Sequence, residues 1–187
     1  FDLGVSCLKN SGSPYKLGNI SLISKEERKK HFAFITNALK PYMYVQSHSW
    51  AGYNGPWIEE VWRDHFIFNS TIDDFGPFVP LFIQWLDIFK LQRKNMTQYH
   101  STLSTIFSYL RTDVLYITVV QNLYGLEGTY ELWNNIPPNI LILSPTSRGH
   151  IPIPHLKEEL SPISLKTGVQ RKRFVFAGKL GYFKPDR

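Results

Sequence analysis

Val114-Leu-Tyr-Ile-Thr-Val-Val-Gln121 determines which class of fold this chain can adopt. The segment is dense in β-branched and aromatic side chains, and it lacks the alternation of apolar and polar residues that marks a strand with one face in water. Such a run predicts a strand that is covered on both faces. Residues 139–143 and 173–177 have the same character, and residues 76–81 predict a short buried strand bounded by prolines.

Helical patterns lie between the predicted strands. Ser24-Lys25-Glu26-Glu27 is a capping-box pattern that begins a helix ending near Leu39. Further helices are predicted over residues 57–68, 81–89 and 98–110, and residues 42–47 alternate like a strand. Because helices and buried strands alternate along the chain, we expect an α/β fold with a mainly parallel sheet.

The composition is that of a globular protein, with 43% apolar and 19% charged residues in a chain of 187. Much of the net charge of +6 lies in two basic runs, residues 25–30 and 171–173, which we interpret as solvated faces. No RNA-binding or zinc-finger signature accompanies them, so no nucleic-acid partner is expected. A partner that carries phosphate, such as a nucleotide-sugar, or an acidic glycan fits the charge better.

Two features of the sequence point to different compartments. The single cysteine, Cys7, allows no internal disulfide and no cysteine-based metal site, which favours a reducing compartment. Three N-x-Ser/Thr motifs, at Asn19, Asn69 and Asn95, are instead typical of the secretory lumen. No signal peptide or membrane span is visible, and we expect the chain to be a fragment because it begins with Phe1.

Polar side chains follow the predicted strands, where open α/β sheets bind their ligands. Gln121 and Asn122 come directly after one strand, and His150 lies in the polar segment after residues 140–143. Amide and imidazole groups hydrogen-bond sugar hydroxyls, so we take these three residues as candidate ligand-binding groups. The alternative is that the segments are polar only because loops are polar.

Tyr53-Asn54-Gly55-Pro56-Trp57 joins a turn to the start of a helix, because glycine tolerates positive φ and proline suits the first helical position. The free backbone N–H groups of that helix are expected beside the two aromatic rings. They could hold a hydroxylated or anionic ligand. Tyr53, Asn54 and Trp57 are therefore further candidate ligand-binding residues.

The helix that follows carries three candidate acid–base groups, Glu59, Asp64 and His65. Its apolar periodicity predicts His65 on the core side, and Glu59 with Arg63 at i, i+4 on the outer side. The alternatives are a surface ion pair for Glu59 and Arg63, and a hydrogen-bonded core histidine for His65. No metal-ligand pattern, nucleophile elbow or phosphate-binding glycine loop is present, so no metal and no cofactor is expected in this chain.

His150-Ile-Pro-Ile-Pro-His155 predicts an extended segment, because each proline fixes its own φ and restricts the residue before it. Its two histidines would lie roughly 16 Å apart, too far to share a metal ion. The simplest interpretation is a rigid surface connector.

The chain resembles the amino-terminal half of an exostosin-like glycosyltransferase over residues 43–178. Short motifs carry the resemblance, and they follow one another in the family's order: Tyr53-Asn-Gly-Pro-Trp-Ile-Glu-Glu-Val-Trp62, Phe78-Val-Pro-Leu-Phe82, Tyr116-Ile-Thr-Val-Val-Gln-Asn122, Asn139-Ile-Leu-Ile-Leu-Ser144, Gly149-His-Ile-Pro-Ile-Pro154 and Arg173-Phe-Val-Phe-Ala-Gly178.

The resemblance implies a GT-B enzyme of two Rossmann-like domains, a type II membrane protein of the Golgi or endoplasmic reticulum. Such an enzyme transfers a sugar from a nucleotide-sugar donor to a glycan or glycoprotein acceptor, with inversion. We then expect an irregular lead-in over residues 1–23, a three-layer Rossmann-like acceptor-side domain over 24–165, and a linker with the first strand of a truncated second domain over 166–187.

The same resemblance implies that the missing second domain holds most of the donor, and that an anchor absent from this chain provides the membrane attachment. Glu59, Asp64 and His65 are then the candidates for the general base, and the chain alone is expected to be inactive. Tyr53, Asn54, Trp57, Gln121, Asn122 and His150 become the candidate acceptor-binding residues. The alternative function is a non-catalytic carbohydrate-binding or protein-interaction module that uses the same aromatic rings without a base.

Overall fold

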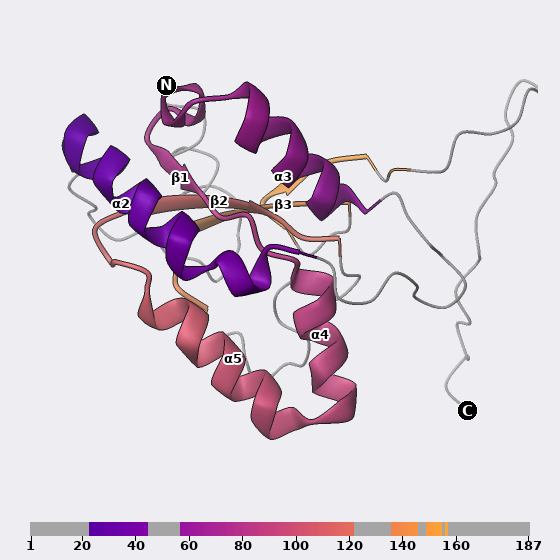
Figure 1. The fold of residues 1–187 in the computed structure, drawn as a ribbon. Coiled ribbons are helices and arrows are strands. Elements are labelled where there is room, and N and C mark those ends of the chain that lie inside the picture. Colours follow the sequence, from indigo (N-terminus) through magenta and orange to yellow (C-terminus); the bar gives the residue numbers. More distant parts are fainter. Residues whose placement is uncertain (1–22, 45–56, 122–135, 146–148, 155, 157–187) are drawn as a thin grey trace, which may run out of the picture.

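The computed structural model describes residues 23–44, 57–121, 136–145, 149–154 and 156. Within them, four strands form one sheet: β1 (Phe78–Pro80), β2 (Leu115–Val119), β3 (Ile140–Ser144) and β4 (Ile151–Pro152) (Figure 1). Every neighbouring pair is parallel, and the strands lie side by side in their order along the chain. The predicted α/β fold with a parallel sheet is confirmed.

Some predictions fall on residues that the structure does not describe. They are the lead-in up to residue 22, the strand over residues 173–177, and the loop residues Tyr53, Asn54 and Asn122. The division of the chain into two domains therefore stays a prediction.

The helices lie close to their predicted positions. In chain order they are α2 (Lys25–Ala38), the 3₁₀ turn η1 (Lys40–Tyr42), α3 (Ile58–Asn69), the 3₁₀ turn η2 (Ile72–Phe75), α4 (Trp85–Lys94) and α5 (Met96–Ser108). The capping pattern holds at α2, where the side chain of Ser24 accepts a hydrogen bond from the backbone N–H of Glu27 at 3.2 Å. The helix predicted from residue 81 begins only at Trp85, because Leu81 still donates its backbone N–H to Ile117 of β2 and residues 81–84 connect the sheet to the helix.

The predicted strand over residues 42–47 is wrong at its beginning. Tyr42 closes η1, and the following Met43 also has helical backbone angles. Pro41 lies in the first turn of η1, where its fixed φ favours a turn over an extended chain. Residues 45–47 lie outside the described part of the chain.

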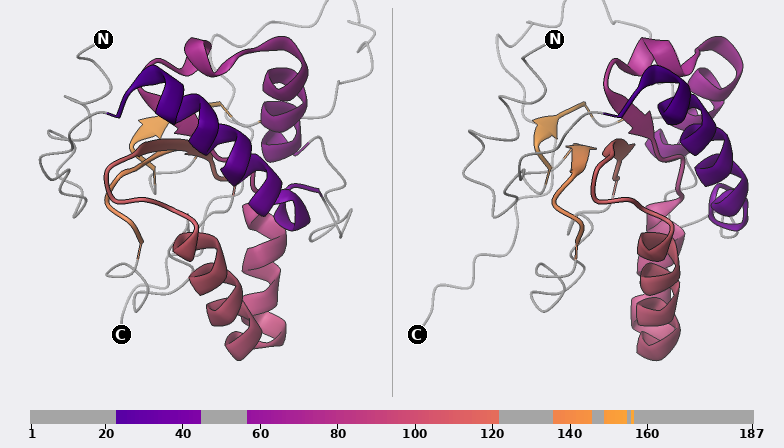
Figure 2. Two further views of the ribbon diagram at one scale, coloured as in Figure 1. Left: turned by 60° about the vertical axis from the view of Figure 1, so that its left-hand side comes forward. Right: turned by 90° about the vertical axis from the view of Figure 1, so that its left-hand side faces the viewer.

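Both faces of the sheet are buried, as the run at residues 114–121 predicts. One face packs against α2, α4 and α5 in a single cluster that includes Ile35, Ile88, Ile106 and Tyr116. Both views of Figure 2 show α4 and α5 lying side by side. The other face carries a smaller cluster of Phe78, Leu115 and Leu141. Adjacent residues of β2 point to opposite faces, and both Leu115 and Tyr116 are at most 2% exposed.

The amino-terminal edge of the sheet is closed by buried hydrogen bonds. The hydroxyl of Tyr116 accepts from the backbone N–H of Arg111 at 2.7 Å, and it lies 2.8 Å from Nε2 of His31 on α2. The amide of Asn139 donates to the carbonyl oxygens of Arg111 and Val114. Side chains and backbone thus satisfy one another at this edge.

The segment that resembled a surface connector forms β4, next to β3. His150 donates its backbone N–H to the carbonyl of Ile142 at 2.8 Å, and its Nδ1 accepts the backbone N–H of Ile142 at 2.9 Å. Gly149 permits this approach, because a Cβ there would lie 2.7 Å from Cβ of Ser144. The imidazole therefore takes the place of a strand carbonyl, and burial lowers its pKa to about 4.

Candidate functional site

Glu59 connects three elements at the carboxyl edge of the sheet. It lies in the first turn of α3, and its side chain is buried. Oε1 accepts the backbone N–H of Gln121, just after β2, at 2.9 Å, and Oε2 accepts the backbone N–H of Leu86 in the first turn of α4 at 3.1 Å. Glu59 thus holds α3 against the end of β2 and the first turn of α4.

The contact between α3 and the end of β2 is reciprocal. The side-chain oxygen of Gln121 accepts the backbone N–H of Ile58 at 2.7 Å. The residue that precedes α3, Trp57, supplies no side-chain cap, and Gln84 supplies none for α4. Gln121 and Glu59 therefore satisfy helix N–H groups that have no partner within their own helices.

The predicted orientation of α3 is wrong. Glu59 and Arg63 face inward, whereas Asp64 and His65 are exposed. Arg63 donates to the carbonyl oxygen of Met43 at 2.5 Å, and its guanidinium lies 4.7 Å from the ring centre of Tyr44. Apolar periodicity failed here because two charged side chains are buried by hydrogen bonds to backbone groups far away in the sequence.

The position of Glu59 changes its acidity. Burial raises its pKa from the usual 4.5 to about 8, and the nearby carboxylate of Asp87 acts in the same direction. The two backbone N–H groups and the ammonium of Lys90 oppose the shift. Glu59 is therefore largely protonated at neutral pH, and its two oxygens hold the backbone of Gln121 and Leu86 in place.

This shift makes the stability of the folded chain depend on pH. Between pH 4.5 and 8 the folded state holds a proton on Glu59 that the unfolded state has released, so the free energy of unfolding falls as the pH rises. Above about pH 7.5 the lowered pKa values of His31 and His150 no longer contribute, since both histidines are then largely neutral in the unfolded as well as the folded state. We expect a fall of about 1 kcal/mol between pH 7.5 and 9.

Urea unfolding at a series of pH values measures this effect. The control is Glu59→Gln, which has no carboxyl group to titrate. This variant should be less stable at every pH, because the NH₂ group of its amide faces a backbone N–H that then lacks an acceptor. Its free energy of unfolding should stay level over this range. An equal slope in both proteins would show that Glu59 is not the group responsible.

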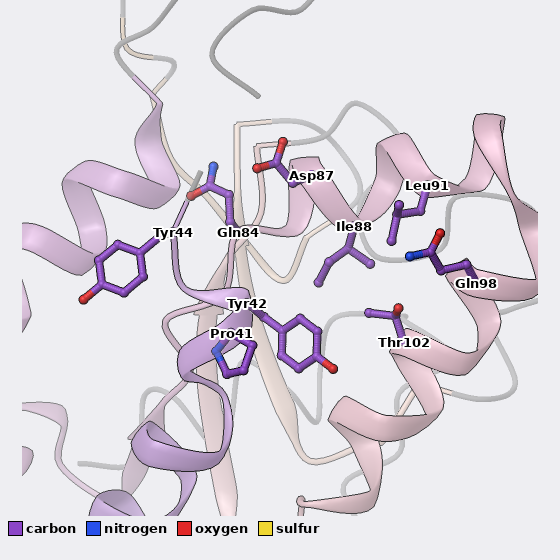
Figure 3. Close-up of a pocket in the computed structure, with 9 residues that line it drawn as sticks. All are labelled: Pro41, Tyr42, Tyr44, Gln84, Asp87, Ile88, Leu91, Gln98 and Thr102. Atoms are coloured by element: carbon purple, nitrogen blue, oxygen red, sulfur yellow. The ribbon is translucent and has the colours of Figure 1, made fainter. Parts of the chain in front are cut away.

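A pocket of 210 Å³ opens beside these contacts. It lies between the end of η1, the beginning of α4 and α5 (Figure 3). In Figure 3 the ring of Tyr42 projects toward Thr102, and Ile88 lies beside them. The complete lining is Pro41, Tyr42, Tyr44, Gln84, Asp87, Ile88, Leu91, Gln98 and Thr102.

The pocket and the Glu59 contacts share the first turn of α4. Leu86 donates its backbone N–H to Glu59, and its neighbour Asp87 lines the pocket. Asp87 accepts from Nζ of Lys90 at 3.0 Å, and that ammonium also lies 5.6 Å from the ring centre of Trp57. A carboxylate, two amides and three hydroxyl groups thus meet apolar side chains at the carboxyl end of β1.

The structure brings some of the predicted residues together and separates others. Trp57, Glu59 and Gln121 lie at the same edge, although Glu59 and Gln121 are occupied by helix N–H groups. Asp64 and His65 face away from the core, and His150 lies beside the middle of β3. The role of each in ligand binding stays a prediction.

Sequence reasoning missed the residues of the pocket. The signal for two of them was present, since Gln84 and Asp87 follow β1 just as Gln121 follows β2. The remaining lining residues come from η1 and α5, and only the packing of these elements reveals them.

The described residues hold no group of three or more histidine, cysteine and acidic side chains that could bind a metal ion. Within the same residues, no helix combines the length and the apolar character that a membrane span requires. Comparisons of the chain with family models, curated proteins and solved structures give no match.

Proposed function

We propose that this chain is the acceptor-side domain of an exostosin-like glycosyltransferase of the GT-B type, located in the lumen of the Golgi or endoplasmic reticulum. The pocket between η1, α4 and α5 binds a sugar unit of the glycan acceptor. A second domain, outside this chain, holds most of the nucleotide-sugar donor. The pocket carries the proposal, together with the order of the sequence motifs and the parallel sheet.

The chemistry of the pocket suits a sugar. Apolar groups of Tyr42, Ile88 and Leu91 offer surfaces for the C–H faces of a ring, and the amides of Gln84 and Gln98 can both donate to and accept from hydroxyl groups. A volume of 210 Å³ is below that of pockets for drug-sized ligands, and it fits one sugar ring rather than an oligosaccharide.

The pocket also changes the candidates for the general base. A base must reach the proton that it removes. Both oxygens of Glu59 accept backbone N–H groups, and Asp64 and His65 are exposed on α3. Asp87 is the carboxylate that lines the pocket, so we assign the proton transfer to Asp87 if the base belongs to this domain.

Sugar binding can be tested on α5 with two matched threonines. Thr102 lines the pocket, whereas Thr105 is exposed and donates to the carbonyl of Ser101. Thr102→Val should weaken binding of the preferred sugar about tenfold, which corresponds to the loss of one hydrogen bond. Thr105→Val should leave the affinity unchanged.

The measurement is titration of the chain with a panel of mono- and disaccharides, followed by NMR chemical shifts. Shifts should gather on residues of η1, α4 and α5. Failure of the whole panel to bind, or an equal affinity of Thr102→Val and the original chain, would contradict the proposal.

A second candidate function is a carbohydrate-binding module without catalysis. The observation that favours it is the engagement of Glu59, the buried acid of α3, in hydrogen bonds to Leu86 and Gln121. Sugar binding without turnover in the full-length protein would select the module.

A further inference from the structure

Phe68 is the most exposed of the large apolar side chains that the structure describes, with 80% of its surface accessible. It lies one residue before the end of α3. Val61, two helical turns earlier on the same face, is 45% exposed. This face of α3 therefore leaves apolar surface in contact with water, most of it at Phe68.

The sequence places a glycosylation motif directly beside this ring. Asn69-Ser70-Thr71 is an N-x-Thr motif, and Asn69 is the exposed last residue of α3. Ser70 and Thr71 are extended, with φ, ψ of −135°, 159° and −109°, 164°. Thr71 caps η2, and its hydroxyl and backbone N–H both donate to the carboxylate of Asp74. The side chain of Asn69, which would carry the glycan, stays exposed at the end of α3.

The second described motif differs in this respect. The side-chain oxygen of Asn95 accepts the backbone N–H of Gln98 at 3.0 Å and caps α5. Met96 and Thr97 already belong to the first turn of that helix. Formation of α5 thus engages the side chain of Asn95 itself, whereas in the motif at Asn69 the capping residue is Thr71 and the asparagine stays exposed.

We propose that Asn69 carries an N-linked glycan and that its first sugars cover the ring of Phe68. The co-reactant is a lipid-diphosphate-linked oligosaccharide. Nδ2 of Asn69 bonds to the anomeric carbon and loses one proton to a base, and the bond from that carbon to the diphosphate oxygen breaks, so that the lipid diphosphate leaves with the electron pair. The C–H face of a sugar then packs on the ring, which removes apolar surface from water. The proposal rests on the luminal location given under the proposed function.

Trypsin separates the three motifs, which makes the test direct. Cleavage after lysine and arginine places Asn19 in the peptide 17–25, Asn69 in 64–90 and Asn95 in 95–111. The full-length protein is isolated from the cells that produce it and treated with peptide N-glycosidase, which converts each glycosylated asparagine to aspartate. Mass spectrometry should find aspartate at position 69 and unchanged asparagine at position 95.

Two variants control for the motif itself. Asn69→Gln should lose the glycan, whereas Ser70→Ala keeps an N-x-Thr motif and should retain it.

Loss of the glycan should also increase the binding of a hydrophobic dye. Phe68→Ser in the Asn69→Gln background should reverse that increase, because the dye would then lack its aromatic surface.

Unmodified Asn69 overturns the proposal. A glycan on Asn19 or Asn95 alone would do so while showing that the chain reaches the secretory lumen. The absence of glycans from all three peptides would also overturn it. That result would leave the pocket untouched, because the titration of unglycosylated chain with sugars tests the proposed function separately. Dye binding that does not change on loss of the glycan would overturn the covering of Phe68.

Discussion

Replacing Glu59 by leucine should lower the free energy of unfolding by about 3–5 kcal/mol. Leucine is close to glutamate in volume, so little cavity forms, but the N–H groups of Leu86 and Gln121 lose their acceptor. Each buried N–H without a partner costs about 1–3 kcal/mol. Urea unfolding at pH 6.5, followed by circular dichroism, measures the loss.

Glu60→Leu is the matched control. It makes the same replacement in the same turn of α3, at a position that is partly open to solvent. Its effect should stay near 0.5 kcal/mol, as for most changes at exposed positions. Equal losses in the two variants would mean that exchanging a glutamate of the first turn for leucine, rather than breaking the hydrogen bonds of Glu59, lowers the stability.

Glu59→Leu should also weaken sugar binding. Leu86 and Asp87 are neighbours in the first turn of α4, one held by Glu59 and the other lining the pocket. A first turn without its acceptor frays, and the position of Asp87 becomes less defined. A reduced affinity in the folded Glu59→Leu protein would show that the contact positions the pocket.

Local sequence patterns were sufficient to predict β1, β2 and β3 and the approximate positions of the helices. The run at residues 114–121 predicts β2 because an apolar strand without alternation must be covered on both faces. Ser24 predicts the start of α2 because the cap and the N–H that it accepts are three residues apart. In both cases the deciding interaction is a property of the segment itself.

The orientation of α3 could not be predicted in this way. The partners of Glu59 are 27 and 62 residues away, and the carbonyl that receives Arg63 is 20 residues away. A periodicity argument counts both side chains as polar and assigns them to solvent. The fold reverses that assignment, because two backbone N–H groups, near α4 and β2, and one carbonyl group, near η1, need buried partners. The long side chains of Glu59 and Arg63 reach these groups.

The pocket depends on the same long-range packing. Tyr42, Asp87 and Thr102 come from three elements that no spacing in the sequence relates. The rule that ligands bind at the ends of parallel strands would have included Gln84 and Asp87 if it had been applied to the exit of β1. It could not have supplied Tyr42 or Thr102, since η1 and α5 contribute no strand end to the sheet.

Asp87→Asn should lower sugar transfer by the full-length protein 10²- to 10⁴-fold, the range expected for the loss of a general base. Asparagine keeps the size of the side chain and can still accept a hydrogen bond from Lys90, but it cannot take the proton of an acceptor hydroxyl. Release of nucleoside diphosphate from a panel of nucleotide-sugars, with and without acceptor, measures turnover. The affinity of the chain for the sugar should change much less than the rate.

Glu60→Gln separates a base from a general effect of charge, because Glu60 is a partly exposed carboxylate on α3 outside the pocket lining. Its rate should match that of the original protein. If Asp87→Asn transfers sugar at the full rate, the base lies elsewhere, and the second domain is the place to search for it. If the original protein binds sugar but releases no nucleotide from any donor, the pocket belongs to a binding module. Rate and affinity together thus decide between the two functions, since only a catalytic role for Asp87 lowers the first and leaves the second nearly unchanged.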